Sequence, residues 1–171
     1  AHSLALRADG TVVAWGYNAQ MQAQVPPGLS DVIAIAAGGY HSLALKADGT
    51  VVAWGLNGNG QTTVPAGLSN VVAIAAGFYH SLALKRDGTV AAWGRNNFGQ
   101  AKVPAGLSGV VAIAAGSYHN LALKSDGTVV AWGWNGYGQS SVPARLSGVV
   151  AIAAGSWHSL AVKRDGTVVA W

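Results

Sequence analysis

The stretch Val71–Ser108, "VVAIAAGFYHSLALKRDGTVAAWGRNNFGQAKVPAGLS", decides the fold, because close copies of it fill the chain. In each copy a histidine, an Asp-Gly pair and a tryptophan recur at intervals of 39 residues. The histidines are His2, His41, His80, His119 and His158, and the tryptophans are Trp15, Trp54, Trp93, Trp132 and Trp171. Four periods of 39 leave 15 of the 171 residues, which form a partial copy. Such a fixed period indicates a tandem-repeat architecture.

One period is interpreted as four short strands, which we name A to D. Val71–Gly77 is a continuous apolar run, typical of a strand buried on both faces. His80–Lys85 is the second strand, and Asp87-Gly88 predicts a tight hairpin turn because these residues tolerate a positive φ. Thr89–Trp93 is the returning strand. Gln100–Pro104 is expected to be a short outer strand, since its proline suits a sheet edge.

These strands predict an all-β fold, a β-propeller of 39-residue blades with four antiparallel strands each. The chain is expected to be one repeat domain, 1–171, made of a 15-residue partial repeat and four repeats. The units are 1–15, 16–54, 55–93, 94–132 and 133–171. Blades that stack face to face explain strands that are apolar throughout. A linear β-solenoid is disfavoured, because its coils pair in parallel whereas the Asp-Gly hairpin predicts antiparallel pairing.

Composition narrows the class of protein. Hydrophobic residues make up 51% of the chain and charged residues 9%, which argues against a disordered chain. The chain has no cysteine, so disulfides and thiolate chemistry are excluded. The net charge of +4 comes without a run of like charges, which argues against a nucleic-acid partner. The apolar runs are too short to cross a bilayer as a helix, so membrane insertion is not expected.

The elements "AIAAG", "HSLALK", "VVAWG" and "VPAGLS" resemble the repeat of the regulator of chromosome condensation family. Their pattern is still more similar to the repeats of the streptomycete β-lactamase inhibitor propellers. The resemblance covers the whole chain and implies a propeller, usually of seven blades. It also implies binding of other proteins through one face, a small GTPase in one case and β-lactamases in another. Because fold does not fix function, the partner stays a hypothesis.

The repeats do not complement one another at the two ends. The first copy lacks strand A and the last lacks strand D, so the ends duplicate strands B and C. The chain also begins without methionine, and we expect a fragment of a larger propeller or a homo-oligomer of several copies. Direct closure of four blades with surplus strands is the remaining alternative. An open blade face exposes apolar surface and an unpaired strand edge, which promote association.

The strand order places the A–B and C–D loops on one face of the disc and the Asp-Gly turns on the other. Aromatic residues recur in register in the A–B loops, where we expect them mainly to cap the blade tips. Elsewhere aromatic residues stand where sister repeats carry other types, so the scaffold does not require them. The candidate partner-binding residues are Tyr17, Phe78, Phe98, Trp134, Tyr137 and Trp157, of which Trp157 belongs to the in-register set.

The repeated polar residues are interpreted as architecture. Equivalent histidines lie a blade width apart, so they cannot share one metal ion at ligand distances of about 2 Å. We expect each to be hydrogen-bonded to a neighbouring strand. Five of the six aspartates lie in Asp-Gly turns, where backbone conformation explains them. No catalytic residues, metal or cofactor are therefore predicted, and the protein is not expected to be an enzyme.

Two functions remain. The first is a protein-binding propeller that holds another protein on the aromatic loop face. The second is a structural module of a self-assembling or filamentous surface protein, in which the partner is a further copy of the chain. Near-identity of the repeats favours the second, because a selected binding face usually diverges from blade to blade.

Overall fold

The computed structural model describes residues 2–171, in which fourteen strands form five antiparallel sheets. Blade 1 contains β1 (His2–Leu6) and β2 (Val12–Gly16). Blade 2 contains β3 (Val32–Ala37), β4 (His41–Lys46) and β5 (Val51–Gly55). Blade 3 contains β6 (Val71–Ala76), β7 (His80–Lys85) and β8 (Val90–Gly94). Blade 4 contains β9 (Val110–Ala115), β10 (His119–Lys124) and β11 (Val129–Gly133). Blade 5 contains β12 (Val149–Ala154), β13 (Ser159–Lys163) and β14 (Val168–Ala170).

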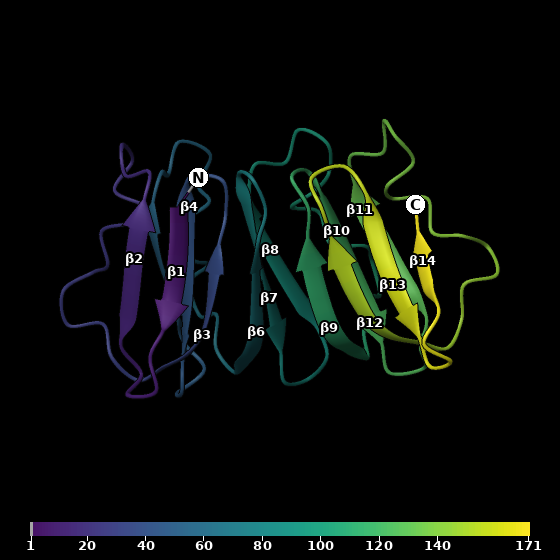
Figure 1. Cartoon of the computed structure of the whole chain (residues 1–171), viewed down its shortest axis with the longest axis horizontal. Coiled ribbons are helices and arrows are strands. Elements are labelled where there is room, and N and C mark those ends of the chain that lie inside the picture. Colours follow the sequence, from purple (N-terminus) through teal and green to yellow (C-terminus); the bar gives the residue numbers. More distant parts are fainter. Residues whose placement is uncertain (1) are drawn as a thin grey trace.

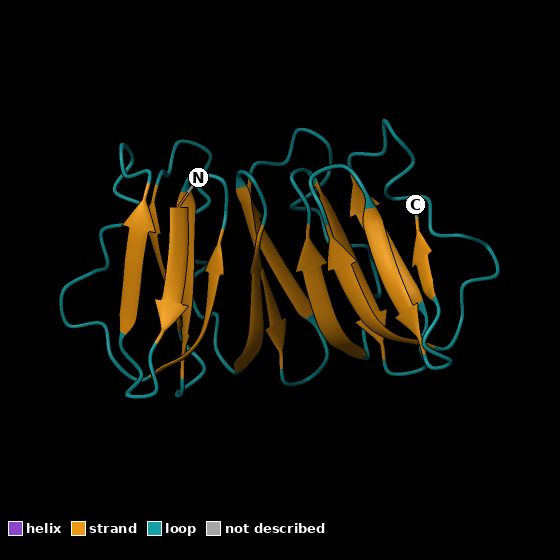
Figure 2. Cartoon of the chain, viewed as in Figure 1, coloured by secondary structure: helices purple, strands orange, loops and turns teal. Residues whose placement is uncertain are grey.

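The blades stand side by side in a curved row (Figure 1). The first strands of blades 2 to 5, which are β3, β6, β9 and β12, contact one another in sequence. Blades 1 and 5 lie at opposite ends of the row (Figure 1), so residues 2–171 do not close directly into a ring. Figure 2 shows strands joined by loops, and no helix that could span a membrane occurs in this part of the chain. The predicted all-β propeller class is confirmed.

The middle strand of each inner blade is buried because its two faces pack on different neighbours. In β4, Leu43 and Leu45 pack against Ala83 and Trp93 of blade 3. Ala44 faces the other way and packs in the cluster shared with blade 1. The middle strand thus presents leucines to one neighbouring blade and an alanine to the other, where the tryptophan of the third strand packs beside that alanine. The sequence shows no strict alternation of apolar and polar residues for this reason.

The predicted fourth strand is wrong. Residues 100–104 form turns and loop, and the sheets contain three strands in blades 2 to 5. The physical reason is that side chains satisfy the backbone here. The Gln100 carbonyl oxygen accepts hydrogen bonds from Asn120 Nδ2 at 2.8 Å and Trp132 Nε1 at 3.1 Å, both in blade 4. Ala101 N donates to Asn96 Oδ1 at 3.0 Å. The segment therefore joins two blades and adds no strand to β8.

Candidate functional site

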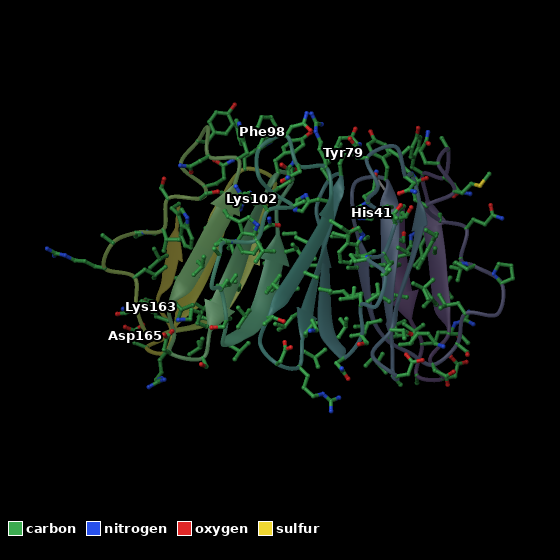
Figure 3. All side chains as sticks on the ribbon, turned by 180° about the vertical axis from the view of Figure 1, so that it is seen from behind. His41, Tyr79, Phe98, Lys102, Lys163 and Asp165 are labelled. Carbon is green, nitrogen blue, oxygen red and sulfur yellow. The ribbon has the colours of Figure 1, made fainter. Side chains whose placement is uncertain are left out.

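Two kinds of loop share one face of the row, as predicted, and we call this the loop face. It comprises the segments between the first and second strands of a blade, such as 77–79, and those that follow the third strand, such as 95–99. The two are joined directly, because Arg95 N donates to the Tyr79 carbonyl oxygen at 2.9 Å. Figure 3 shows Tyr79 and Phe98 at this edge of the molecule, with Lys163 and Asp165 at the opposite edge, the turn face.

The six candidate residues all belong to one connected row of aromatic rings along the loop face. Tyr17 contacts Tyr40 with ring centroids 6.1 Å apart. Phe78 lies 5.3 Å from Tyr40 in an edge-to-face arrangement. The row continues from Phe78 through Tyr118 to the rings of blades 3, 4 and 5. Tyr40 and Tyr79 stack at 5.8 Å, so the in-register tyrosines do pack on one another as expected of capping residues.

Part of this row surrounds a hollow of about 340 Å³, which we call the aromatic pocket. Its lining residues are Arg95, Phe98, Tyr118, Trp134, Tyr137 and Trp157. Trp134 meets Tyr137 at 4.9 Å and Trp157 at 5.2 Å, both edge-to-face. Four candidates therefore converge, whereas Tyr17 and Phe78 lie outside the pocket. Another hollow, of about 300 Å³, lies at the C-terminal ends of the first strands of blades 2 to 5. It is lined mainly by alanine, glycine and serine and contains no charged side chain.

Arg95 is the charged residue of the aromatic pocket, and sequence reasoning missed it. Its guanidinium carbon lies 5.6 Å from the ring centres of Tyr79 and Tyr118 and 5.9 Å from that of Phe98. Such contacts attract the cation to the ring faces. Arg95 occupies the repeat position held by Trp134 one blade later, so a search for any unrepeated residue, aromatic or not, would have found it. Tyr118 belongs to the in-register aromatic residues that we expect to cap the blade tips, and it also lines the pocket.

Below the loop face, one hydrogen-bond arrangement joins each blade to the next, and we call it the latch. Between blades 2 and 3, Ser81 Oγ donates to the Gln61 carbonyl oxygen at 2.9 Å. His41 Nε2 lies 2.9 Å from the same hydroxyl. Because the serine hydrogen is already used, His41 Nε2–H is the donor of that bond. Trp93 Nε1 donates to the Gln61 oxygen as well, at 2.9 Å.

The pairing of a latch histidine with a serine, or in one case an asparagine, recurs at every junction. The pairs are His2 with Ser42, His41 with Ser81, His80 with Asn120 and His119 with Ser159. Asn120 performs both serine roles, since its Oδ1 accepts from His80 at 2.7 Å while its Nδ2 donates to the Gln100 carbonyl. The prediction that each repeated histidine bonds a neighbouring strand is confirmed for these four. Among residues 2–171 no group of three His, Cys, Asp or Glu is placed to hold a metal ion.

The latch glutamines also mark the limits of a known sequence repeat. The profile of the "Regulator of chromosome condensation (RCC1) repeat" matches residues 1–22, 32–61, 71–100, 110–139 and 149–171. Four of these stretches end at a latch glutamine. The chain belongs to the RCC1 repeat family. A search of curated protein sequences finds no match.

Solved structures place this RCC1-repeat chain beside longer relatives. Yeast RCC1 (Prp20), solved bound to Kap60, shares 26% identity with a TM-score of 0.84, over 99% of this chain and 54% of that one. The ectodomain of the receptor kinase CR4 of Physcomitrella patens has 24% identity and a TM-score of 0.84, over 99% and 49%. Human WBSCR16 has 22% identity and a TM-score of 0.80, over 100% and 59%. The chain thus spans between 49% and 59% of these relatives, and the two below 25% identity show the fold alone.

Burial sets the protonation state of the latch in these RCC1 repeats. It lowers the pKa of His41, His80 and His119 to about 4. These imidazoles are therefore neutral at pH 7, and the tautomer that carries the hydrogen on Nε2 makes the latch bond. Their side chains are fully covered, which removes them from contact with any ligand on the loop face.

The turn face of the RCC1 repeats carries the carboxylates. In blade 3, Asp87 Oδ1 accepts from Thr89 N at 3.0 Å and from Thr89 Oγ1 at 2.6 Å, and Lys85 Nζ lies 3.1 Å from Asp87 Oδ2. The hydrogen bond from the Thr89 hydroxyl, followed by that from its amide, lowers the pKa of Asp87 to about 2. Gly88 supplies the positive φ of 77° that the hairpin turn needs. This arrangement explains the repeated aspartates without a catalytic role.

Proposed function

We propose that this chain is part of a protein-binding propeller that holds its partner at the aromatic pocket of the loop face. The observation that carries the proposal is the convergence of Phe98, Trp134, Tyr137 and Trp157 on one exposed hollow. Large rigid aromatic side chains dominate binding hot spots in protein interfaces. Tyr137 leaves 73% of its surface exposed, so its burial is still available to a partner.

The scaffold does not explain Phe98, Trp134 and Tyr137. Leu56 occupies the repeat position of Trp134, and Asn59 occupies that of Phe98 and Tyr137. The loop that contains Leu56 and Asn59 nevertheless makes the same backbone bonds, for example Leu56 N to the Tyr40 oxygen at 2.9 Å. Relatives give further support, since yeast RCC1 was crystallised with Kap60, and Prp20p from Saccharomyces cerevisiae was studied for binding to Gsp1p and histones. We also propose that the chain is not an enzyme, because four of its five histidines are used in latches and five of its six aspartates lie in Asp-Gly turns.

The test uses substitutions that the chain itself contains. We expect the variant F98N/W134L/Y137N to keep the fold and to lose binding of partners selected from a displayed library of protein fragments. Arg86→Ser on the turn face is the matched control, because Ser125 stands there in the next repeat. Fragments that bind the wild-type chain and the triple variant equally well would place the partner elsewhere.

A second candidate function is end-to-end association of copies, which one observation favours. Trp15, the tryptophan of blade 1, is 54% exposed, whereas Trp54 at an inner junction is 8% exposed and its Nε1 donates to the Gln22 carbonyl oxygen. His158 at the other end is exposed and is the histidine half of a further latch. Two copies could join the His158 end of one to the Trp15 end of the other, a head-to-tail contact.

Light scattering after size-exclusion chromatography tests this association. A mass that rises with concentration in the 171-residue chain, and that falls to one chain in Trp15→Ala or His158→Ala, would support it. A single-chain mass at all concentrations would exclude it.

A further inference from the structure

The charges of this molecule are divided unevenly between its two faces. The aspartates of the Asp-Gly turns all lie on the turn face, and Asp31 lies there too, because its carbonyl oxygen accepts from Ala47 N beside such a turn. Four lysines on the turn face lie within 4 Å of these aspartates, at 3.8, 3.1, 3.2 and 3.1 Å. Arg95 has no such counter-charge. The aromatic pocket therefore contains a cation without an anionic partner among residues 2–171.

The rings hold Arg95 in place without using its donors. The guanidinium lies over the faces of Tyr79, Phe98 and Tyr118 at 5.6 to 5.9 Å, and cation–π attraction favours this position. Its N–H groups donate to no acceptor within the described chain. A guanidinium presents a fixed fork of donors that matches a carboxylate in a two-point contact. The pocket wall is thus preorganised for an anion.

The aromatic residues of the pocket indicate which chemical group lies beside the anion in a ligand. Phe98, Trp134, Tyr137 and Trp157 offer apolar ring surface around the guanidinium. A trimethylammonium group would suit aromatic rings alone, but the charge of Arg95 repels it. Single-stranded nucleic acid also binds aromatic rings and arginines, but its phosphates need several cations in a row. The pocket contains a single cation, Arg95. An acidic side chain next to an apolar one fits all of these features.

We propose that the aromatic pocket selects a partner segment in which an aspartate or glutamate adjoins an aromatic or large aliphatic residue, with Arg95 as the counter-ion. This inference rests on the proposed function and specifies its partner. The carboxylate accepts two N–H bonds from Arg95 while the neighbouring apolar side chain covers Trp134 and Trp157. Both contacts become stronger as the partner excludes water from the pocket.

The experiment selects peptides from a displayed random dodecapeptide library on the wild-type chain. We expect enrichment of Asp or Glu beside an apolar residue. The most enriched peptide is then synthesised with its acid and with the matching amide, Asn or Gln. Arg95→Leu, a residue that the scaffold already carries as Leu56, should weaken the acidic peptide about tenfold or more and leave the amide peptide unchanged. Arg145→Gln, an exposed cation outside the pocket, should change neither.

The outcomes separate this inference from the proposed function. Peptides that lose binding in F98N/W134L/Y137N but show no acidic preference, or that bind Arg95→Leu equally well, overturn the inference alone. A library that yields no peptide dependent on those three residues overturns both. Binding of the single-stranded probe dT12 that is lost in Arg95→Leu would replace the acidic peptide by a nucleic acid and also overturn the inference.

Discussion

The turn face and the loop face are built from the same repeats but differ in what they repeat. On the turn face, Asp48, Asp87, Asp126 and Asp165 each accept two hydrogen bonds from the threonine two residues later, at nearly equal distances. On the loop face the backbone bonds repeat, as from Leu56, Arg95 and Trp134, while the side chains at that position share no chemistry. Residues that recur in every repeat therefore belong to the scaffold, whereas residues that differ between repeats lie on surface that is available for binding.

The largest effect is expected where a repeated glycine permits the latch. A Cβ on Gly116 would collide with the His119 ring and lie 2.6 Å from the Gly155 carbonyl oxygen. Gly116→Ala should therefore lower the free energy of unfolding by about 3 kcal/mol or more. Gly58→Ala on the loop face is the control, because no atom lies within 4 Å of its added Cβ. Urea denaturation measures both, and equal midpoints for the two variants would contradict the steric role of Gly116.

The two kinds of repeated polar residue should lose their contributions to stability in different pH ranges. Burial lowers the pKa of His41, His80 and His119 to about 4, so the unfolded chain takes up protons first as the pH falls. Stability should be full above pH 6.5, decline from there to about pH 4, and fall by about 1–3 kcal/mol per histidine. The pKa of Asp87, lowered to about 2 by the Thr89 bonds, places the loss from the turns below pH 3.8.

Urea denaturation between pH 8 and pH 3 resolves these two ranges. His80→Gln, which cannot be protonated, should flatten the decline above pH 4 relative to the wild-type chain. Thr89→Val, which removes the hydroxyl bond to Asp87, should leave that decline in place. A wild-type stability that is constant from pH 7 to pH 4 would show that the latch histidines are not buried in their neutral form.

The sequence predicts the repeated half of this molecule better than the unrepeated half. Strands such as His80–Lys85 and the Asp87-Gly88 turn follow from local pattern and turn chemistry. The expected strand at Gln100–Pro104 fails because its partners are side chains of the next blade, 20 and 32 residues further on. No local pattern contains those partners. Because the repeats are nearly identical, comparing them does not reveal that the glutamine carbonyl accepts hydrogen bonds from the next blade.

The candidate site was half predictable for the same reason. Trp134 and Tyr137 are identified by comparing repeats, since sister repeats carry non-aromatic residues such as Leu56 and Asn59 at the same positions. The pocket itself depends on the angle between neighbouring blades, which brings Phe98 of one loop to Trp134 of the next at 6.3 Å. Sequence spacing does not contain that angle. Tyr17 and Phe78 satisfy the same sequence criterion and lie outside the pocket.

A smaller effect is expected when an aromatic residue of the loop face is removed. Tyr137→Asn introduces the residue that stands at position 59, and Tyr137 is mostly exposed. The free energy of unfolding should fall by less than about 1 kcal/mol, which is the size of its edge-to-face contacts with Trp134 and Trp157. Thermal and urea unfolding check this value. A loss of several kcal/mol would mean that the ring is scaffold, and the comparison of the two faces would fail at this position.

The smallest effect is expected at the loop-face position where a residue other than glycine adopts a positive φ. Met21 has φ of 60° and occupies the place of Gly60, Gly99 and Gly138, which adopt the same left-handed region. A side chain in this region costs about 1 kcal/mol, partly offset by the greater freedom of glycine in the unfolded chain. Met21→Gly should therefore raise the free energy of unfolding by about 0.5 kcal/mol, whereas Met21→Ala keeps the strain and should not. A stabilisation by alanine equal to that by glycine would attribute the gain to removal of the exposed methionine side chain instead of to φ.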